Sequence, residues 1–371
     1  MNARRTYLDY NATAPLRPEA RAAVVAALDV FGNPSSVHAE GRRARAIVDE
    51  AREAIAALVN AEASEVVFTS GATEANTWAL SAPWQWIAFA GIEHDSVRGP
   101  AVEIAAARGA VAVELPVARD GAVDIPLDGD GNGLLVALQM ANNETGVLQD
   151  VATAGLKALA YGARLHCDAV QAPGRIAIDF KTLGASTLSL SAHKIGGPKG
   201  VGALVVGSGV PLPPLFTGGG QEQRRRAGTE NVAAIAGFGA AARAALKDLD
   251  GAPRLAALRD RLEADVKHVT PEAVIVGADA PRLPNTSSIA LPGASAETLV
   301  IKMDLAGIAV SAGAACSSGK VGESHVLNAM GLAPEIASSA IRVSIGPETT
   351  EDDIAAFVAA WKRICGASLA A

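Results

Sequence analysis

The sequence predicts an α/β protein, with a large domain built on a mainly parallel sheet and a smaller α+β domain. Its 371 residues are enough to bury a large core and to form two domains. Half of the residues are hydrophobic but only 4% are aromatic, so alanine, valine and leucine must supply most of the packing. This composition suits helices laid on a parallel sheet. Short apolar runs also alternate with helical patterns, the order that a doubly covered sheet requires.

Five short apolar runs are predicted to be largely buried strands of the large domain. They lie at residues 65–69, 86–90, 134–138, 164–167 and 203–206. Helical stretches, such as residues 151–161, separate them. Because strands that alternate with helices usually pair in parallel, these runs predict one mainly parallel sheet.

The pattern changes after about residue 249, where a second domain is predicted to begin. Pro253 and Arg254 precede a helix whose apolar stripe lies at Leu255, Leu258, Leu262 and Val266. Short strands and a terminal helix follow. Thr350 is the expected N-cap of that helix, and its apolar positions are Ile354, Phe357, Val358, Trp361 and Ile364. We therefore assign residues 16–249 to the large domain and residues 250–371 to the smaller one.

The net charge and the cysteine content limit the classes of protein to which this chain can belong. A net charge of -7 argues against general binding to nucleic acid or anionic lipid, although a local patch could still dock a charged partner. The chain shows neither a signal peptide nor an apolar run long enough to span a bilayer. Cys167, Cys316 and Cys365 cannot all pair and lack metal-ligand spacing. We expect a soluble cytoplasmic protein that keeps its thiols reduced and holds no metal.

The residues around Lys194 give the most specific chemical signal. Lys194 lies between an apolar strand-like run and the glycine-rich turn 196–200. Asp168 ends an earlier predicted strand, and Gln171 follows three residues later. Pyridoxal 5'-phosphate (PLP) needs an amine for its Schiff base and a carboxylate for its pyridinium nitrogen. We therefore expect a PLP site in which Gln171 lies near the ring hydroxyl. The glycine turn lacks the pattern of a nucleotide-binding P-loop, which excludes an ATPase.

A phosphate site is expected where residues 70–74 follow a predicted strand and open a helix. The backbone amides of Ala72 and Thr73, with the Thr73 hydroxyl, are the candidate ligands, because free amides at a helix start bind anions. Strand-to-helix turns often have such a sequence, so this pattern alone is a weak signal.

The sequence closely resembles the cysteine desulfurases, which are PLP enzymes that take sulfur from L-cysteine. The resemblance runs from residues 7–13 to residues 338–342, and several motifs occur in the family's order and approximate spacing. It implies a PLP-dependent transferase fold of the aspartate aminotransferase type. It also implies that residues 1–15 pack with the smaller domain.

The resemblance assigns further residues to the cofactor. Ser191 and His193 match phosphate ligands, although an isolated His193 could be a loop histidine bonded to a backbone carbonyl. His94 matches the histidine that stacks on the ring and transfers protons, and its alternative is an ordinary helix-start histidine. Thr229 matches a threonine that reaches the neighbouring subunit's phosphate, which implies a homodimer. Alone, the basic segment before it would be a solvated turn.

Three residues are assigned to the substrate side of the pocket. Asn143 matches an asparagine that contacts a cofactor oxygen and the region of the substrate carboxylate. Arg342 matches the arginine that binds the α-carboxylate with a planar fork, although it could instead form a structural ion pair. Asn33 is a further candidate for this pocket, and a turn or cap role explains it nearly as well.

Cys316 distinguishes a desulfurase from an aminotransferase. The glycines and small polar residues of segment 311–324 are typical of an exposed, mobile loop. An isolated cysteine would be interpreted as a small packing residue, which is our interpretation of Cys167 and Cys365. The resemblance makes Cys316 the nucleophile that receives sulfur as a persulfide.

These roles imply a reaction and two enzymatic alternatives. Lys194 would remove the Cα proton, Asp168 would keep the ring nitrogen protonated, and the Cys316 thiolate would attack the substrate sulfur while alanine is formed. A selenocysteine lyase or a PLP-dependent aminotransferase of the same fold remains an alternative, and the aminotransferase would not need Cys316. A non-catalytic sulfur-relay scaffold is a third, which the intact Lys194, Asp168 and Cys316 argue against.

The expected partner is a sulfur-acceptor protein, such as a scaffold for iron–sulfur cluster assembly. The segment from Cys316 to His325 resembles that of the family's long-loop group, which serves general or nitrogenase iron–sulfur assembly. The chain stops at Ala371, without the C-terminal extension of the housekeeping members. The pathway therefore stays open.

Overall fold

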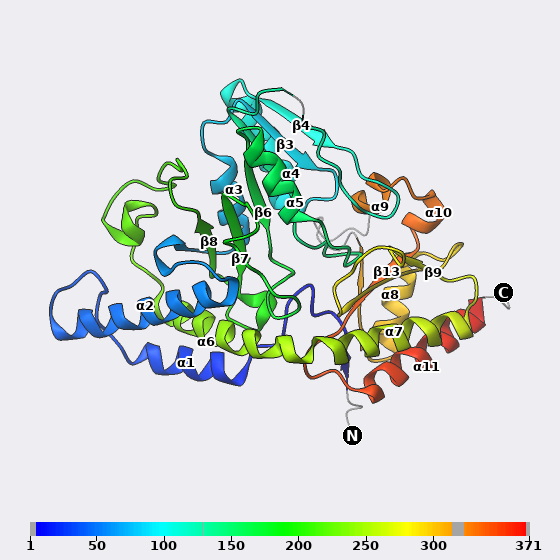
Figure 1. The fold of residues 1–371 in the computed structure, drawn as a ribbon. Helices are drawn as coiled ribbons and strands as arrows, with labels where there is room; N and C mark the ends of the chain where they lie inside the picture. The colour runs from blue at the N-terminus through cyan, green and yellow to red at the C-terminus, as the bar shows by residue number, and fades with distance from the viewer. Residues whose placement is uncertain (1–4, 128, 314–322, 369–371) are drawn as a thin grey trace.

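A computed structural model describes residues 5–127, 129–313 and 323–368, and Figure 1 shows their arrangement. The central feature is a seven-stranded sheet with the strand order β2-β8-β7-β6-β5-β3-β4. Its strands are β2 (Val66–Thr69), β3 (Trp86–Ala90), β4 (Val111–Leu115), β5 (Leu134–Ala137), β6 (Arg164–Asp168), β7 (Thr187–Ser191) and β8 (Gly202–Val206).

Most neighbouring strands of this sheet are parallel. The pairs β3–β4, β3–β5, β5–β6 and β6–β7 are parallel, whereas β8 runs antiparallel to both β7 and β2. The mainly parallel α/β fold is therefore confirmed. Each of the five expected strands is present, with bounds that differ by no more than one residue. Strand β4 was not among them, and β7 was expected only as the strand-like run before Lys194. Along β4 only Leu115 is buried, and the charged Glu114 separates it from the apolar residues before it.

Helices cover both faces of the sheet, as the alternation of side chains along β3 shows. Ile87 and Phe89 pack against Val97 of α4, whereas Ala88 and Ala90 belong to the larger core on the opposite face. The helices of this part are α1 (Pro18–Leu28), α2 (Ala39–Val59), α3 (Ala72–Leu80), α4 (Asp95–Arg108), α5 (Val151–Ala160) and α6 (Val232–Asp248). Buried residues of α2, α5 and α6 belong to the larger core, and α3 packs with β2 and β8 on the other face.

A second, antiparallel sheet has the strand order β12-β13-β10-β9. Its strands are β9 (Val274–Val276), β10 (Thr286–Ala290), β12 (Ser311–Ala312) and β13 (Ala340–Ser344). The helices α7 (Ala252–Val269), α8 (Ala296–Leu305) and α11 (Glu351–Ser368) contribute to a separate buried cluster beside it. The expected stripe of α7 is buried there, together with Phe357 and Trp361 of α11.

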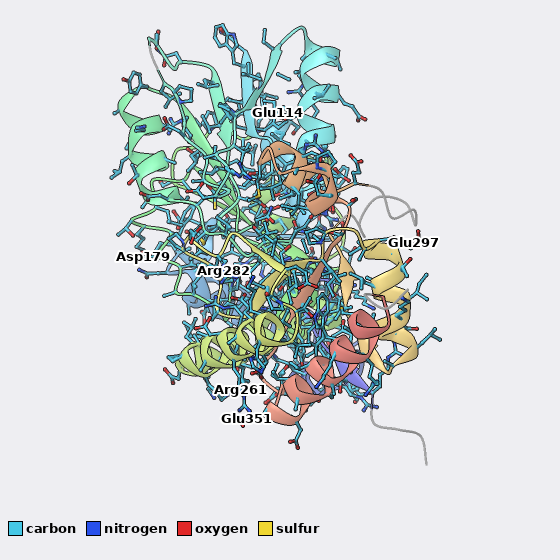
Figure 2. The ribbon with its side chains drawn as sticks, turned by 90° about the vertical axis from the view of Figure 1, so that its right-hand side faces the viewer. Glu114, Asp179, Arg261, Arg282, Glu297 and Glu351 are labelled. Carbon is cyan, nitrogen blue, oxygen red and sulfur yellow. The ribbon has the colours of Figure 1, made fainter. Side chains whose placement is uncertain are left out.

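Polar contacts join α7 to α11. Arg261 Nη1 lies 2.9 Å from Glu351 Oε2, and Figure 2 shows the two side chains together. Trp361 Nε1 donates to Thr270 Oγ1 at 3.0 Å. The N-cap expected at Thr350 is present, because the Asp353 amide donates to Thr350 Oγ1 at 3.3 Å.

The N-terminal segment contacts both parts of the chain. Strand β1 (Thr6–Tyr7) pairs in parallel with β11 (Ile308–Ala309), and Leu8 is buried in the cluster of the second sheet. The Arg17 amide instead donates to the carbonyl of Gly196, in the large part. Domain boundaries at residues 15/16 and 249/250 remain our prediction. Within the described ranges, no helix is long and apolar enough to span a membrane.

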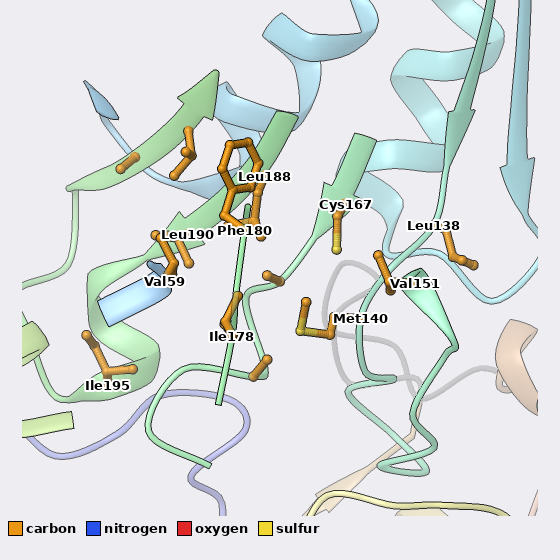
Figure 3. Close-up of a cluster of buried hydrophobic side chains, with 14 of the residues drawn as sticks. Val59, Leu138, Met140, Val151, Cys167, Ile178, Phe180, Leu188, Leu190 and Ile195 are labelled. Carbon is orange, nitrogen blue, oxygen red and sulfur yellow. The ribbon is translucent and has the colours of Figure 1, made fainter. Parts of the chain in front are cut away.

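Both cysteines that the structure describes are packing residues. Cys167 of β6 lies in the larger core, where Figure 3 shows it near Met140, and Cys365 lies in the cluster beneath α11. Burial raises the pKa of the Cys167 thiol well above its usual value, and the nearby charge of Asp168 adds to the shift. Burial raises the pKa of Cys365 to about 11. Neither is suited to act as a thiolate at neutral pH.

We expect iodoacetamide to modify only Cys316 when the native protein is treated at about pH 8, since a thiol with a raised pKa stays protonated there. Mass spectrometry of peptides identifies the alkylated residues. Cys316→Ser should abolish the adduct, and denaturant should expose Cys167 and Cys365. An adduct on either buried cysteine in the native protein would contradict the packing described above.

Gly239 allows α6 to approach α2 closely. A Cβ at position 239 would lie 2.6 Å from Ala51 Cα and 2.7 Å from Ala51 Cβ. Gly239→Ala should therefore lower the free energy of unfolding by about 1–2 kcal/mol, because overpacking outweighs the gain in helix propensity. Thermal unfolding checks this. The control is Gly251→Ala, since a Cβ at residue 251 meets nothing within 4 Å and φ is -87°. An unchanged melting temperature for Gly239→Ala would show that the helices can move apart freely.

Candidate active site

A cavity of about 560 Å³ lies at the C-terminal ends of the parallel strands β5, β6 and β7. This edge is where open α/β sheets usually bind ligands. Ten of the expected site residues line it: Ala72, Thr73, His94, Asn143, Asp168, Gln171, Ser191, His193, Lys194 and Arg342. They come from both sheets, because Arg342 lies in β13 and Asp168 in β6.

Lys194 lies in the short 3₁₀ helix η2 (Ala192–Ile195), directly after β7. Its Nζ donates to the carbonyl oxygens of Asn11, at 2.5 Å, and Ala12, at 3.1 Å. Both residues belong to the N-terminal segment and line the cavity. The amine is therefore held at the cavity wall by backbone acceptors.

Asp168 ends β6 and is 8% exposed. Its Oδ1 accepts a bond from the Val170 amide at 3.0 Å, and its Oδ2 accepts one from Asn76 Nδ2 at 2.8 Å. Each carboxylate oxygen therefore has a hydrogen-bond donor. An anion held at this depth is what a protonated ring nitrogen would bind.

Gln171 is oriented by a buried arginine. Arg175 Nη1 donates to Gln171 Oε1 at 2.5 Å and to the Gln171 carbonyl at 2.9 Å. The amide nitrogen of Gln171 therefore points the other way and donates to Asn11 O at 3.2 Å. Burial, followed by the charge of Arg342, lowers the pKa of Arg175 to about 9, so Arg175 remains protonated at neutral pH.

The expected phosphate end of the cavity begins at the start of α3. Gly71 is its N-cap and has no side chain that could cap the first-turn amides of Ala72 and Thr73. Ser191 and His193 also line the cavity. His193 Nδ1 lies 3.2 Å from Thr13 Oγ1, and burial, with the charge of Lys194, lowers the pKa of His193 to about 4. His193 is therefore neutral at pH 7.

His94 combines the two interpretations that its sequence allowed. It is the N-cap of α4, because its Nδ1 accepts a bond from the Ser96 amide at 3.0 Å. It also lines the cavity. The cap fixes one ring nitrogen, so a position in the cavity and a role at the helix start are compatible.

Arg342 likewise combines an ion pair with a position in the cavity. Its Nη2 donates to Asp9 Oδ1 at 2.6 Å, and its Nη1 donates to the Asn143 carbonyl at 3.1 Å. Within the part of the chain that the structure describes, Nε is buried and has no hydrogen-bond partner. A carboxylate bound beside it would satisfy that donor.

Two expected site residues do not join this cluster, and the structure does not describe a third. Thr229 is exposed and does not line the cavity. Asn33 is also exposed and forms a turn, since its Oδ1 accepts a bond from the Ser35 amide at 2.9 Å. Cys316 lies outside the described residues, so its role remains a prediction.

Sequence reasoning missed several polar residues of this site. Asn11 and Thr13 belong to the N-terminal motif that carried the resemblance, but no role was given to them. Asn76 follows Ala72 by about one helical turn, and Arg175 follows Gln171 by four residues. Helical spacing could have placed Asn76 beside the site, but its partners are distant in sequence.

The residues of the cavity fit PLP. A buried carboxylate, an amine and an uncapped helix start line one cavity, together with an arginine whose Nε is buried and unsatisfied. These groups can hold a pyridinium nitrogen, an aldehyde carbon, a phosphate and a substrate carboxylate, respectively.

The chain is similar to known proteins along most of its length. Residues 6–357 match the family model described as Aminotransferase class-V. A protein of Cereibacter sphaeroides named cysteine desulfurase is 44% identical over 363 residues, which covers 94% of this chain and 93% of that protein. The cysteine desulfurase IscS of Dictyoglomus turgidum is 39% identical over 364 residues, covering 95% and 92%.

Solved structures agree. The X-ray structure of a NifS-like protein from Rickettsia africae aligns with a TM-score of 0.89 at 35% identity, over 98% of this chain and 99% of that one. The sequence, the sheet and the cavity thus lead to one assignment: the chain belongs to the class-V aminotransferase family and, within it, to the cysteine desulfurases.

Proposed function

We propose that this chain is a PLP-dependent cysteine desulfurase that converts L-cysteine to L-alanine and transfers the sulfur to Cys316 as a persulfide. The observation that carries the proposal is the meeting of Lys194, Asp168 and Arg342 at one cavity, in a chain related end to end to proteins named cysteine desulfurases. Class-V aminotransferases are PLP enzymes, and this cavity has the donors and acceptors that PLP requires.

Bound PLP would supply an electron sink for the pair released when a Cα–H bond breaks. Asp168 would hold the ring nitrogen, Gln171 would face the ring hydroxyl, and Ala72, Thr73, Ser191 and His193 would hold the phosphate. The neutral state of His193 allows one of its ring nitrogens to donate to a phosphate oxygen.

Lys194 and Arg342 would position and deprotonate the substrate. Arg342 would bind the α-carboxylate, and Asp9 and the Asn143 carbonyl keep its guanidinium in place. Lys194 Nζ would hold the cofactor and then, as a free amine, accept the Cα proton. The Asn11 and Ala12 carbonyls could accept a bond from the protonated amine.

The sulfur step would use Cys316. Its thiolate would form an S–S bond with the substrate sulfur while the Cβ–S bond breaks. The electron pair of the broken bond would stay with the three-carbon fragment, which is protonated and leaves as alanine. A sulfur-acceptor protein, such as an iron–sulfur scaffold, would then take the sulfur. We place this chemistry in the cytoplasm, where a reducing environment keeps Cys316 a thiol.

A homodimer would complete the site. Asn33 and Thr229 lie outside the cavity of their own chain, and their two segments touch, because Gln221 Nε2 lies 3.4 Å from Ser35 Oγ. The side chains of Phe31 and Val37, which flank Asn33, are each 88% exposed. Exposed apolar side chains of this kind favour burial against a second copy of the chain. Thr229 would then reach the phosphate site of the neighbouring subunit.

L-Cysteine and a thiol reductant should yield alanine and sulfide in equal amounts. Cys316→Ser should lose both products and keep the visible absorption of bound PLP, whereas Lys194→Ala should lose the products and that absorption. Quantifying alanine and sulfide together, with an absorption spectrum, provides the check. Cys365→Ser is the matched control and should keep the wild-type rate. Sulfide release by Cys316→Ser at the wild-type rate would rule out the persulfide step.

Mixed dimers test the place of Thr229. If it acts in the neighbouring site, refolding Lys194→Ala and Thr229→Ala subunits together should restore about a quarter of the wild-type activity, since half of the dimers are hybrids with one intact site. Each variant alone should be nearly inactive. No restoration, although light scattering shows dimers, would place Thr229 in its own chain's site or outside catalysis.

A further inference from the structure

Asn76 is a fully buried polar residue of α3 that no role above uses. Its side chain bonds to three different residues: Asp168, Ser96 and His166. Asp168 belongs to the expected cofactor site, and the Ser96 amide donates to His94 Nδ1. A single amide therefore lies between the carboxylate and the imidazole of the reaction.

The orientation of the Asn76 amide follows from its partners. Nδ2 lies 2.8 Å from Asp168 Oδ2 and 2.9 Å from Ser96 Oγ. A carboxylate only accepts hydrogen bonds, so this atom must be the amide nitrogen, and both of its hydrogens are used. The amide oxygen then faces His166 Nε2 at 3.0 Å.

The state of His166 secures that orientation. An amide oxygen cannot donate, so His166 Nε2 carries a proton. Burial lowers the pKa of His166 to about 4, so the ring is neutral at pH 7 and its Nδ1 accepts a bond from Thr187 Oγ1 at 2.9 Å. Each polar atom of this buried chain has a partner, and such a network resists rearrangement.

Ser96, at the other end of the network, determines which ring nitrogen of His94 carries the proton. The Ser96 amide donates to His94 Nδ1, so a neutral His94 carries its proton on Nε2. Ser96 Oγ lies 2.9 Å from the same Nδ1 and accepts the bond from Asn76. The Ser96 amide and the Ser96 hydroxyl can therefore both donate to His94 Nδ1, and these two donors would oppose protonation of that nitrogen.

One further acid contacts this region. Glu93 is fully buried, and its Oε1 accepts a bond from the Gln139 amide at 2.5 Å. Burial, with the charge of Asp168, raises the pKa of Glu93 well above its usual value. Both causes favour the neutral form of Glu93 over a second anion beside Asp168.

We propose that Asn76 is a positioning residue that joins Asp168 to His94 through Ser96. It holds the Asp168 carboxylate aimed into the cavity, and it holds His94 in the tautomer with the proton on Nε2. The proposal rests on the function proposed above, because it assigns work to Asp168 and His94 in that reaction.

The Asn76→Asp variant distinguishes a positioning role of Asn76 from a role in packing alone. Asn76→Asp keeps the shape and the acceptor for His166, but it removes both N–H donors and puts a carboxylate against Asp168. Two carboxylates in contact cannot both stay ionised, so Asp168 would compete for a proton. Asn76→Ala removes the donors without adding an acid. If Asn76 only fills space, the isosteric aspartate should be the milder change.

We expect Asn76→Ala to lower kcat for alanine formation by roughly ten- to a hundredfold with little change in KM, the usual loss for a hydrogen bond to a charged group. Asn76→Asp should be slower still. Both should move the pH midpoint of the cofactor's visible absorption upward, by about one unit, because a more basic Asp168 draws the ring proton and weakens electron withdrawal by the ring. Thr77→Ala, the next residue of α3, is the matched control and should resemble the wild type.

Ser96→Ala tests the link to His94 without touching Asp168. The Ser96 amide still donates to His94 Nδ1, but the bond from Asn76 is lost. We expect kcat to fall about fivefold, as for a neutral hydrogen bond, and the absorption midpoint to stay unchanged. In the double variant with Asn76→Ala, the losses should be less than multiplicative, because both changes break the same link. The Ser96→Ala variant still tests the link to His94 if the changes at Asn76 prevent folding.

The outcomes separate the two proposals. A wild-type protein that makes neither alanine nor sulfide contradicts the proposed function, whatever the variants do. If the wild type is a desulfurase, an Asn76→Asp variant with wild-type kcat and midpoint overturns the role of Asn76 at Asp168. Fully multiplicative losses in the double variant, or a Ser96→Ala variant with wild-type kcat, overturn the link to His94.

Discussion

The charge of Asp168 is the constraint on which the site depends, because an anion must be kept 8% exposed at the end of a buried strand. Burial of an unpaired carboxylate is costly, and hydrogen bonds to its charged form offset part of that cost. The Val170 amide and Asn76 supply such bonds. Burial also raises the pKa of Glu93, which disfavours a second anion beside Asp168. The parallel pairing of β6 with β7 then brings Lys194, just beyond β7, to the same edge of the sheet.

The second sheet contributes the cation. Arg342 is central in that sheet, since β13 pairs with β10 on one side and with β12 on the other, so its backbone is firmly placed. Asp9 and the Asn143 carbonyl restrain the guanidinium and leave Nε as the unsatisfied donor. Asp9 would weaken the attraction for a substrate carboxylate, yet it removes the entropy cost of ordering a long side chain at binding. The arrangement favours precise placement of the substrate over maximal affinity.

Local patterns made much of this structure predictable. The buried strands are short apolar runs with helices between them, and Lys194, Asp168 and Gln171 follow strands that end at one edge. The dual position of His94, the ion pair of Arg342 with Asp9 and the network of Asn76 were not predictable in this way. Each depends on contacts between residues far apart in sequence, such as Asn76 with Asp168, and spacing along one helix or strand carries no information about them.

The same distinction explains Asn33 and Thr229. The resemblance assigns Thr229 to the neighbouring PLP phosphate and makes Asn33 a candidate for the substrate pocket. The fold of a single chain instead puts both residues on its surface, next to side chains as apolar and exposed as Phe31 and Val37. A role in the site and a position on the surface conflict in a monomer. They agree if each subunit brings these residues to the cavity of its neighbour. The uncapped start of α3 favours a dimer of this kind, because its free amides can bind an anion such as the cofactor phosphate. An exposed hydroxyl from the neighbouring chain could reach that anion without crossing the core. Dimerisation would then be a condition of a complete phosphate site as well as a way to bury apolar surface.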